Sequence, residues 1–148
     1  MPTASRLFGA LAFALVGFFA AEMLKPSFPE GYNFGLFSVI CGLLGVIVGW
    51  LVMGHVRGGA STRSAMATGI RASFLLLLWG MIAFSIREML VRSVDRRYDG
   101  IQQALEGTFE IMVEYGGLVF SSSTTLIVLI VGGLLGGMFV NWAAVRWN

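Results

Sequence analysis

The residues of this sequence that could do chemistry are few and scattered. There is one histidine, His55, and one cysteine, Cys41, which lies in an apolar run and has no second thiol to pair with. A metal site needs several ligands, and a disulfide needs two cysteines. No serine–histidine–acid set and no phosphate-binding glycine loop is present. We therefore predict that the protein is not an enzyme and that it has no metal site and no cofactor.

Acidic residues next to apolar segments are stronger candidates for a functional site. Glu22 is the only charge within the first apolar segment, and Lys25 follows it by three residues. Glu88 lies just past the third apolar segment and precedes Arg92 by four residues. An ionisable side chain inside a membrane is a candidate functional group, although an opposite charge at this spacing also favours a simple ion pair. We predict the ion pairs Glu22–Lys25 and Glu88–Arg92.

A third group of acids lies on the segment of residues 101–118, which has two stripes at helical spacing. These stripes predict an amphipathic helix. Three carboxylates at the bilayer centre would cost about 2.5–3.5 kcal/mol each, so this helix should lie at the interface or pack on other helices. The acids then face solvent or, alternatively, a basic surface of a partner protein. The apolar stripe is Ile101, Leu105, Phe109 and Met112, and the acidic stripe is Glu106, Glu110 and Glu114.

The composition indicates which kind of protein positions these residues. Hydrophobic residues make up 57% of the 148-residue chain and charged residues 12%. Soluble domains carry about 25% charged residues, so a soluble enzyme and a disordered tail are excluded. The net charge of +2 is too small for a nucleic-acid-binding surface. We expect an integral membrane protein whose main partner is the lipid bilayer.

Four segments have the length and apolar character of transmembrane helices, which need about 20 residues. The first could also be a signal peptide, but its end lacks the paired small residues of a cleavage site, so we interpret it as a retained helix. We predict an all-α, polytopic membrane protein with four transmembrane helices and one amphipathic helix between the third and the fourth, forming one domain over residues 1–148. The expected spans are residues 7–24, 34–54, 71–90 and 125–145.

The connecting segments carry most of the remaining charge. Residues 55–71 form an expected connector that has no acid, and residues 121–125 form an expected loop or helix cap. The helix of the third span should continue past the membrane and stop near Asp99 and Gly100. With four spans the basic residues divide five to five between the two sides, but those on the side away from the termini are accompanied by acids. We therefore favour cytoplasmic termini.

Glycines at GxxxG spacing form another pattern. Small residues let membrane helices approach each other closely. Two interpretations remain open: these glycines pack helices within the chain, or they form the interface of a homo-oligomer or of a complex with another membrane protein. The glycine pairs are Gly45 with Gly49, Gly132 with Gly136, and Gly133 with Gly137.

A set of short motifs resembles the TrgA family of alphaproteobacterial membrane proteins. The motifs extend over nearly the whole chain: residues 18–22 (FFAAE), Lys25-Pro26, residues 29–31 (PEG), Gly49-Trp50, residues 52–54 (VMG), residues 97–100 (RYDG) and residues 114–116 (EYG). The resemblance implies an inner-membrane protein that is associated with tellurite resistance, and it implies no catalytic residues.

Two functions follow as hypotheses. The first is a resistance-associated membrane protein that does no chemistry of its own. The alternative is an accessory or stabilising subunit of a larger respiratory or photosynthetic membrane complex. Direct binding of the tellurite oxyanion would need clustered arginines, and the only acid-free set is Arg57, Arg63 and Arg71.

Overall fold

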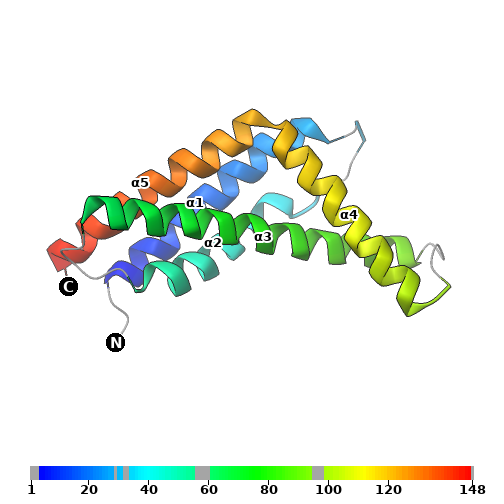
Figure 1. Ribbon diagram of the computed structural model, residues 1–148, viewed down its shortest axis with the longest axis horizontal. Coiled ribbons are helices and arrows are strands. Elements are labelled where there is room, and N and C mark those ends of the chain that lie inside the picture. The colour runs from blue at the N-terminus through cyan, green and yellow to red at the C-terminus, as the bar shows by residue number, and fades with distance from the viewer. Residues whose placement is uncertain (1–3, 29, 32–33, 56–60, 95–98, 148) are drawn as a thin grey trace.

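The computed structural model of the protein describes residues 4–28, 30–31, 34–55, 61–94 and 99–147, and they form five α-helices and one short 3-10 helix (Figure 1). This agrees with the all-α expectation. The helices are α1 (Ala4–Leu24), η1 (Lys25–Ser27), α2 (Phe37–Met53), α3 (Thr62–Val94), α4 (Ile101–Ser121) and α5 (Ser123–Trp147).

Four of the helices form a bundle, and α4 leans away from it. Helices α1 and α5 lie side by side, α2 packs on α1, and α3 crosses them, as Figure 1 shows. The C-terminal half of α3 extends beyond the bundle and forms a helical hairpin with α4. Both chain ends lie at the same end of the bundle, where the rings of Phe8 and Trp147 stack with their centroids 5.0 Å apart.

The outer surfaces of the helices are apolar. On α1, Leu7, Leu11 and Leu15 are all more than half exposed at a spacing of four residues, whereas the glycines and Phe13 face inward. Within the described residues, three segments are long and apolar enough to cross a membrane, namely Ala4–Ser27, Thr62–Val94 and Ser123–Trp147. Such extensive apolar exposure is typical of a surface that contacts lipid. The chain is therefore a helical membrane protein by length and composition.

Helix α3 is longer than the sequence analysis predicted. The expected connector of residues 55–71 is wrong in its second half, because α3 already begins at Thr62. The hydroxyl of Ser61 accepts a hydrogen bond from the backbone N–H of Ser64 at 3.3 Å, which caps the first turn. At its other end α3 is described as far as Val94. The expected end of the helix near Asp99 depends on residues 95–98, which lie outside the described residues.

The remaining helix bounds differ less from expectation. Helix α2 has 17 residues and is shorter than the expected span of residues 34–54. The expected loop at residues 121–125 reduces to Ser122, which separates α4 from α5. The Ser122 hydroxyl accepts a hydrogen bond from the backbone N–H of Thr125 at 3.4 Å, so it acts as the cap of α5.

The buried face of α4 is not its most apolar face. Of the predicted apolar stripe, Ile101, Leu105 and Phe109 are exposed, Phe109 by 68%. The helix instead packs on the bundle through a row of residues at a spacing of four that combines a glycine, two aliphatic residues and one tyrosine, with Ile111 fully buried. The buried residues of α4 are Gly107, Ile111, Tyr115, Gly116 and Val119.

Two apolar clusters form the core. The first lies between α1, α2, α3 and α5 and includes Phe13, Met53 and Val140, each fully buried. The second lies where α4 joins the bundle and includes Phe37, Phe84, Ile111 and Tyr115. Because α4 contributes only to the second cluster, its removal would expose one end of the bundle and leave the first cluster intact.

Candidate functional site

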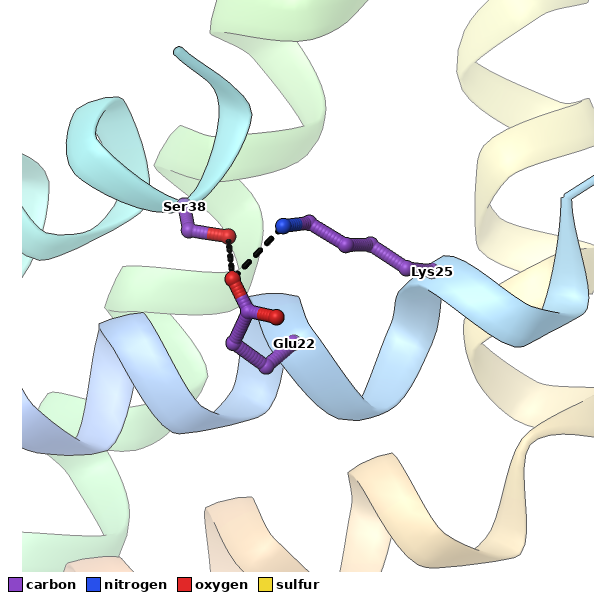
Figure 2. Close-up of polar contacts among 3 residues, drawn as sticks. All are labelled: Glu22, Lys25 and Ser38. Atoms are coloured by element: carbon purple, nitrogen blue, oxygen red, sulfur yellow. Dashed lines mark hydrogen bonds and ion pairs between the residues drawn. The ribbon is translucent and has the colours of Figure 1, made fainter. Parts of the chain in front are cut away.

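The predicted pair of Glu22 and Lys25 lies at the junction between α1 and α2. The Lys25 Nζ atom is 2.6 Å from Glu22 Oε1, and the hydroxyl of Ser38 donates a hydrogen bond to the same carboxylate oxygen (Figure 2). Lys25 also lies 5.8 Å from the centre of the Phe34 ring. Ser38 is in the first turns of α2 and is 6% exposed, so its bond to Glu22 ties the end of α1 to the start of α2.

Ser38 was missed by the sequence analysis. It lies 16 residues from Glu22, and a single serine in an apolar run gives no signal of its own. Its contact depends on the antiparallel packing of two helices. The charged pair itself is about a third exposed, with side-chain exposures of 30% for Lys25 and 37% for Glu22. This exposure is typical of a structural ion pair near a membrane surface, where long side chains reach water.

The second predicted pair connects α3 to α4. The Nε atom of Arg92 lies 3.2 Å from Glu88 Oε1, and an Nη2 atom of Arg92 lies 3.9 Å from Glu114 Oε2. One member of the acidic stripe of α4 is therefore close to a basic side chain of α3. All three acids of the stripe are exposed, and no ion pair is recorded for Glu106 or Glu110 among the described residues. Together these contacts give the hairpin of α3 and α4 a polar outer edge.

The glycines of α2 bring it into backbone contact with α1. A Cβ atom at Gly45 would overlap the carbonyl oxygen of Phe13, and one at Gly49 would overlap the carbonyl oxygen of Gly9. On α1, a Cβ atom at Gly17 would overlap the carbonyl oxygen of Cys41. Both helices therefore contribute glycines to one interface, and the contribution of α1 was not predicted.

The glycines of α5 face two other helices of the same chain. A Cβ atom at Gly137 would overlap the carbonyl oxygen of Ala65 on α3, and one at Gly133 would lie 2.6 Å from the Ser73 hydroxyl oxygen. Gly132 and Gly136 face α1, where the nearest atoms belong to Val16 and Phe13. All six predicted packing glycines are thus used within this chain, which favours the internal interpretation of the GxxxG spacings over an interface with a partner.

An apolar cavity lies where the two core clusters meet. It is partly open to the surroundings and has a free volume of about 70 Å³. Residues from all five α-helices line it, including four aromatic rings whose planes meet edge to face or at a tilt. These rings belong to Phe28, Phe37, Phe84 and Tyr115. This cavity could not be predicted from the sequence, because its walls come from segments far apart in the chain.

The two ends of the bundle differ in charge. The helix ends that lie beside the chain termini carry described bases and no described acid: Arg6 at the start of α1, Arg63 at the start of α3 and Arg146 at the end of α5. Arg71 lies further along α3, next to Gly69, which contacts the middle of α5. The opposite half, with the hairpin, carries the acids Glu22, Glu30, Glu88, Asp99, Glu106, Glu110 and Glu114 and the bases Lys25, Arg87 and Arg92.

The arginines considered for oxyanion binding do not form a cluster in the described part of the chain. Arg57 lies outside the described residues. Arg63 and Arg71 are both exposed on α3, eight residues or about 12 Å apart along the helix axis. Within the described residues there is also no group of three or more potential metal-binding side chains.

The chain was compared with known families, proteins and structures. No model of a known protein family matches the chain, and no curated protein and no solved structure matches it.

Proposed function

We propose that this chain is an inner-membrane protein that crosses the bilayer four times and contributes to tellurite resistance without chemistry of its own. The four-span arrangement is supported by the packing of α2. Gly49 faces Gly9 of α1, and Ser38 bonds to Glu22, so α2 runs antiparallel to α1 over most of its length. A helix that follows a membrane-spanning helix through the same depth crosses the bilayer as well.

The length of α2 is compatible with this role. Its 17 residues extend for about 25 Å, somewhat less than the roughly 30 Å of a hydrocarbon core. The end residues can reach the interfaces by snorkelling, and bilayers thin locally around a short span. Helix α4 has three exposed acids, so we assign it to the membrane surface beside the hairpin end.

The charge difference between the two ends supports an orientation. The end that holds both termini has arginines without acids, and cytoplasmic segments are enriched in such bases. Three of the four exposed tryptophans are near helix ends on this side, Trp50 on α2 and Trp142 and Trp147 on α5, whereas Trp79 is in the middle of α3. Aromatic rings of this kind are common at the membrane–water interface. We therefore assign both termini to the cytoplasm.

The association with tellurite resistance depends on the resemblance to the TrgA family. The observation that supports it best is that several residues of the resembling motifs lie at contacts between helices. Gly49 faces Gly9, Tyr115 is buried beside Phe28, and Glu22 bonds to Ser38. Positions of this kind constrain the residue type strongly, so their agreement with the family motifs carries more weight than that of exposed positions.

Deletion of the gene tests this proposal. We expect the deletion strain to grow more poorly than its parent on tellurite, and a plasmid copy to restore growth. The same strains on selenite and on a detergent distinguish a specific effect on tellurite from a general weakening of the membrane. Unchanged growth on tellurite after deletion would contradict the proposed association.

A second candidate function is supported by the outer side of α4. Phe109 and Val113 are 68% and 75% exposed, and the acids Glu106 and Glu110 lie next to them. An accessory subunit could dock on a larger membrane complex through this face. Purification in a mild detergent through a tag tests it: a co-purifying set of subunits supports the accessory role, and a chain that runs alone or as a simple homo-oligomer contradicts it.

A further inference from the structure

Arg71 of α3 carries a charge that no described side chain balances. Its side chain is exposed, and it makes no ion pair and no hydrogen bond with any described residue. At a surface in contact with water the solvent would satisfy the guanidinium. Inside a membrane a charged side chain is costly, and such residues are usually paired with another polar group. The depth of Arg71 therefore decides what it requires.

The contacts of Gly69 place Arg71 near the depth of the middle of α5. A Cβ atom at Gly69 would overlap the carbonyl oxygen of Gly133, which lies two residues, or about 3 Å, from the central residue of α5. Arg71 is two residues further along α3, which adds about 3 Å. If α5 crosses the bilayer, the backbone of Arg71 lies within about 6 Å of the middle of a hydrocarbon core that is roughly 30 Å thick.

The Arg71 side chain does not reach the membrane surface on the side of the chain termini. A Cβ atom at Gly137 would overlap the Ala65 carbonyl oxygen, one turn from the contact above, so α3 and α5 run antiparallel and Arg71 is close to the level of Val131. Trp142 is eleven residues, or about 16 Å, further along α5. Side chains lean towards the N-terminus of their helix, which for α3 is this direction, but three methylene groups do not cover that distance. The start of α5 is about 12 Å away in the opposite direction.

Arg71 belongs to an exposed face that continues along α3. The Arg71 face consists of Ala67, Arg71, Phe74 and Leu78, which are all exposed and follow one another at intervals of four, three and four residues, the spacing of one side of a helix. Trp79, beside this face, is 54% exposed at the centre of the charge-free residues 72–86. Its ring N–H needs an acceptor, which lipid chains do not offer. Apolar area together with a small residue and two polar groups suits another helix better than lipid.

The charge of Arg71 defines the chemistry of that helix. A carboxylate is the group that matches a guanidinium best, because it accepts two parallel hydrogen bonds from it. A second copy of this chain does not supply one at the right depth. Within the described residues, α2 and α5 carry no acid, and Glu22 of α1 already bonds to Lys25 and Ser38. Glu88 of α3 lies 17 residues, or about 25 Å, from Arg71 along the helix.

We propose that the Arg71 face packs against a transmembrane helix of another membrane protein, and that the Arg71 guanidinium donates hydrogen bonds to an aspartate or glutamate of that helix. This inference depends on the crossing of the bilayer by α3 and α5 proposed above, but not on the association with tellurite. It also does not depend on docking through α4, because the Arg71 face lies on another helix.

Photo-crosslinking in cells that produce the protein tests the proposal. The full chain carries p-benzoyl-phenylalanine in place of Phe74, and a second form carries it in place of Leu135, which is exposed on α5. We expect the probe at Phe74, but not the one at Leu135, to form an adduct with one membrane protein. The adduct should be lost in Arg71→Leu and kept in Arg71→Lys. It should also be kept in the control Arg63→Leu, since Arg63 is exposed near the start of α3.

The identity of the crosslinked helix completes the test. Mass spectrometry of the adduct should find a helix with an acid, whose replacement by the amide abolishes crosslinking. Arg71→Glu combined with arginine at the partner's acid should restore it. An adduct that persists in Arg71→Leu, one with lipid alone, one with a second copy of this chain, or one with a helix that has no acid would overturn the proposal.

A separate measurement distinguishes failure of this proposal from failure of the membrane crossing. The purified chain with Arg71→Cys in a Cys41→Ala background is reconstituted in vesicles without any partner and treated with a membrane-impermeant maleimide. We expect no labelling until detergent is added. Labelling of intact vesicles would contradict the depth of Arg71 and hence the proposed crossing. A protected thiol without any partner adduct in cells would leave the crossing intact and overturn only the docking proposal.

Discussion

At the scale of single residues, the close approach of the helices depends on which glycines lie against the backbone of a neighbouring helix. Gly42 and Gly45 are three residues apart on α2, and both face α1. A Cβ atom at Gly45 would overlap the Phe13 carbonyl oxygen, whereas one at Gly42 would lie 3.6 Å from the Ala14 carbonyl oxygen, which is ordinary contact. The spacing of glycines in the sequence indicated a contact surface but could not identify its partner helix.

These two positions make a matched pair of substitutions. We expect Gly45→Ala to destabilise the protein by about 1–3 kcal/mol, because α1 and α2 must separate to make room for the methyl group. Gly42→Ala should be neutral or slightly stabilising, since alanine is favoured over glycine within a helix by up to about 1 kcal/mol. Thermal or denaturant unfolding in detergent measures both. Equal losses of stability would contradict the close approach at Gly45.

The cluster at Glu22 allows a second comparison. The Ser38 hydroxyl is buried and bonds to a carboxylate, an interaction that contributes about 1.5–3 kcal/mol to stability. Lys25 and Glu22 are about a third exposed, so water screens their attraction and the ion pair contributes little to stability. We therefore expect Ser38→Ala to lower the unfolding free energy more than Lys25→Met. A larger loss for Lys25→Met would show that the ion pair, and not the serine, holds α1 to α2.

At the scale of elements, the sequence predicted the existence of the helices well. It predicted less well the residue at which each helix begins and the face that each helix buries. The apolar periodicity of residues 101–118 correctly indicated α4. It did not indicate the buried face, which depends on contacts far apart in the sequence: Gly116 faces the Met81 side chain of α3, and the Tyr115 ring lies 5.6 Å from the ring of Phe28. The early start of α3 was missed because an arginine-rich segment has no apolar pattern, and the cap at Ser61 was overlooked.

The two faces of α4 can be distinguished by substitution. Ile111 is fully buried, so Ile111→Ala should cost about 2–5 kcal/mol of stability through loss of contacts and the cavity it leaves. Phe109 is 68% exposed, so Phe109→Ala should change the stability of the isolated protein by less than about 0.5 kcal/mol. Unfolding in detergent provides the comparison. The reverse order would mean that α4 packs through the apolar stripe that the sequence suggested.

At the scale of the whole molecule, the sequence predicted equal numbers of basic residues on the two sides of the membrane. Counting bases on each side of four predicted spans gave five and five, because a linear count does not show which residues gather at one end. The bundle brings both termini and the start of α3 together, so that bases without acids lie at one end and all described acids at the other. This arrangement makes the orientation experimentally accessible.

Cysteine labelling tests the proposed crossing of the bilayer by α3. In a Cys41→Ala background, Arg63→Cys and Glu110→Cys place single thiols at exposed positions on opposite ends of the molecule, and Leu135→Cys places one on the apolar surface. We expect a membrane-impermeant maleimide to label Glu110→Cys in intact spheroplasts and Arg63→Cys only after permeabilisation. Leu135→Cys should resist labelling until the membrane is dissolved, because a thiol in hydrocarbon does not ionise. Labelling of both end positions from the same side would mean that α3 does not cross the bilayer, and the proposed topology would then have to be abandoned.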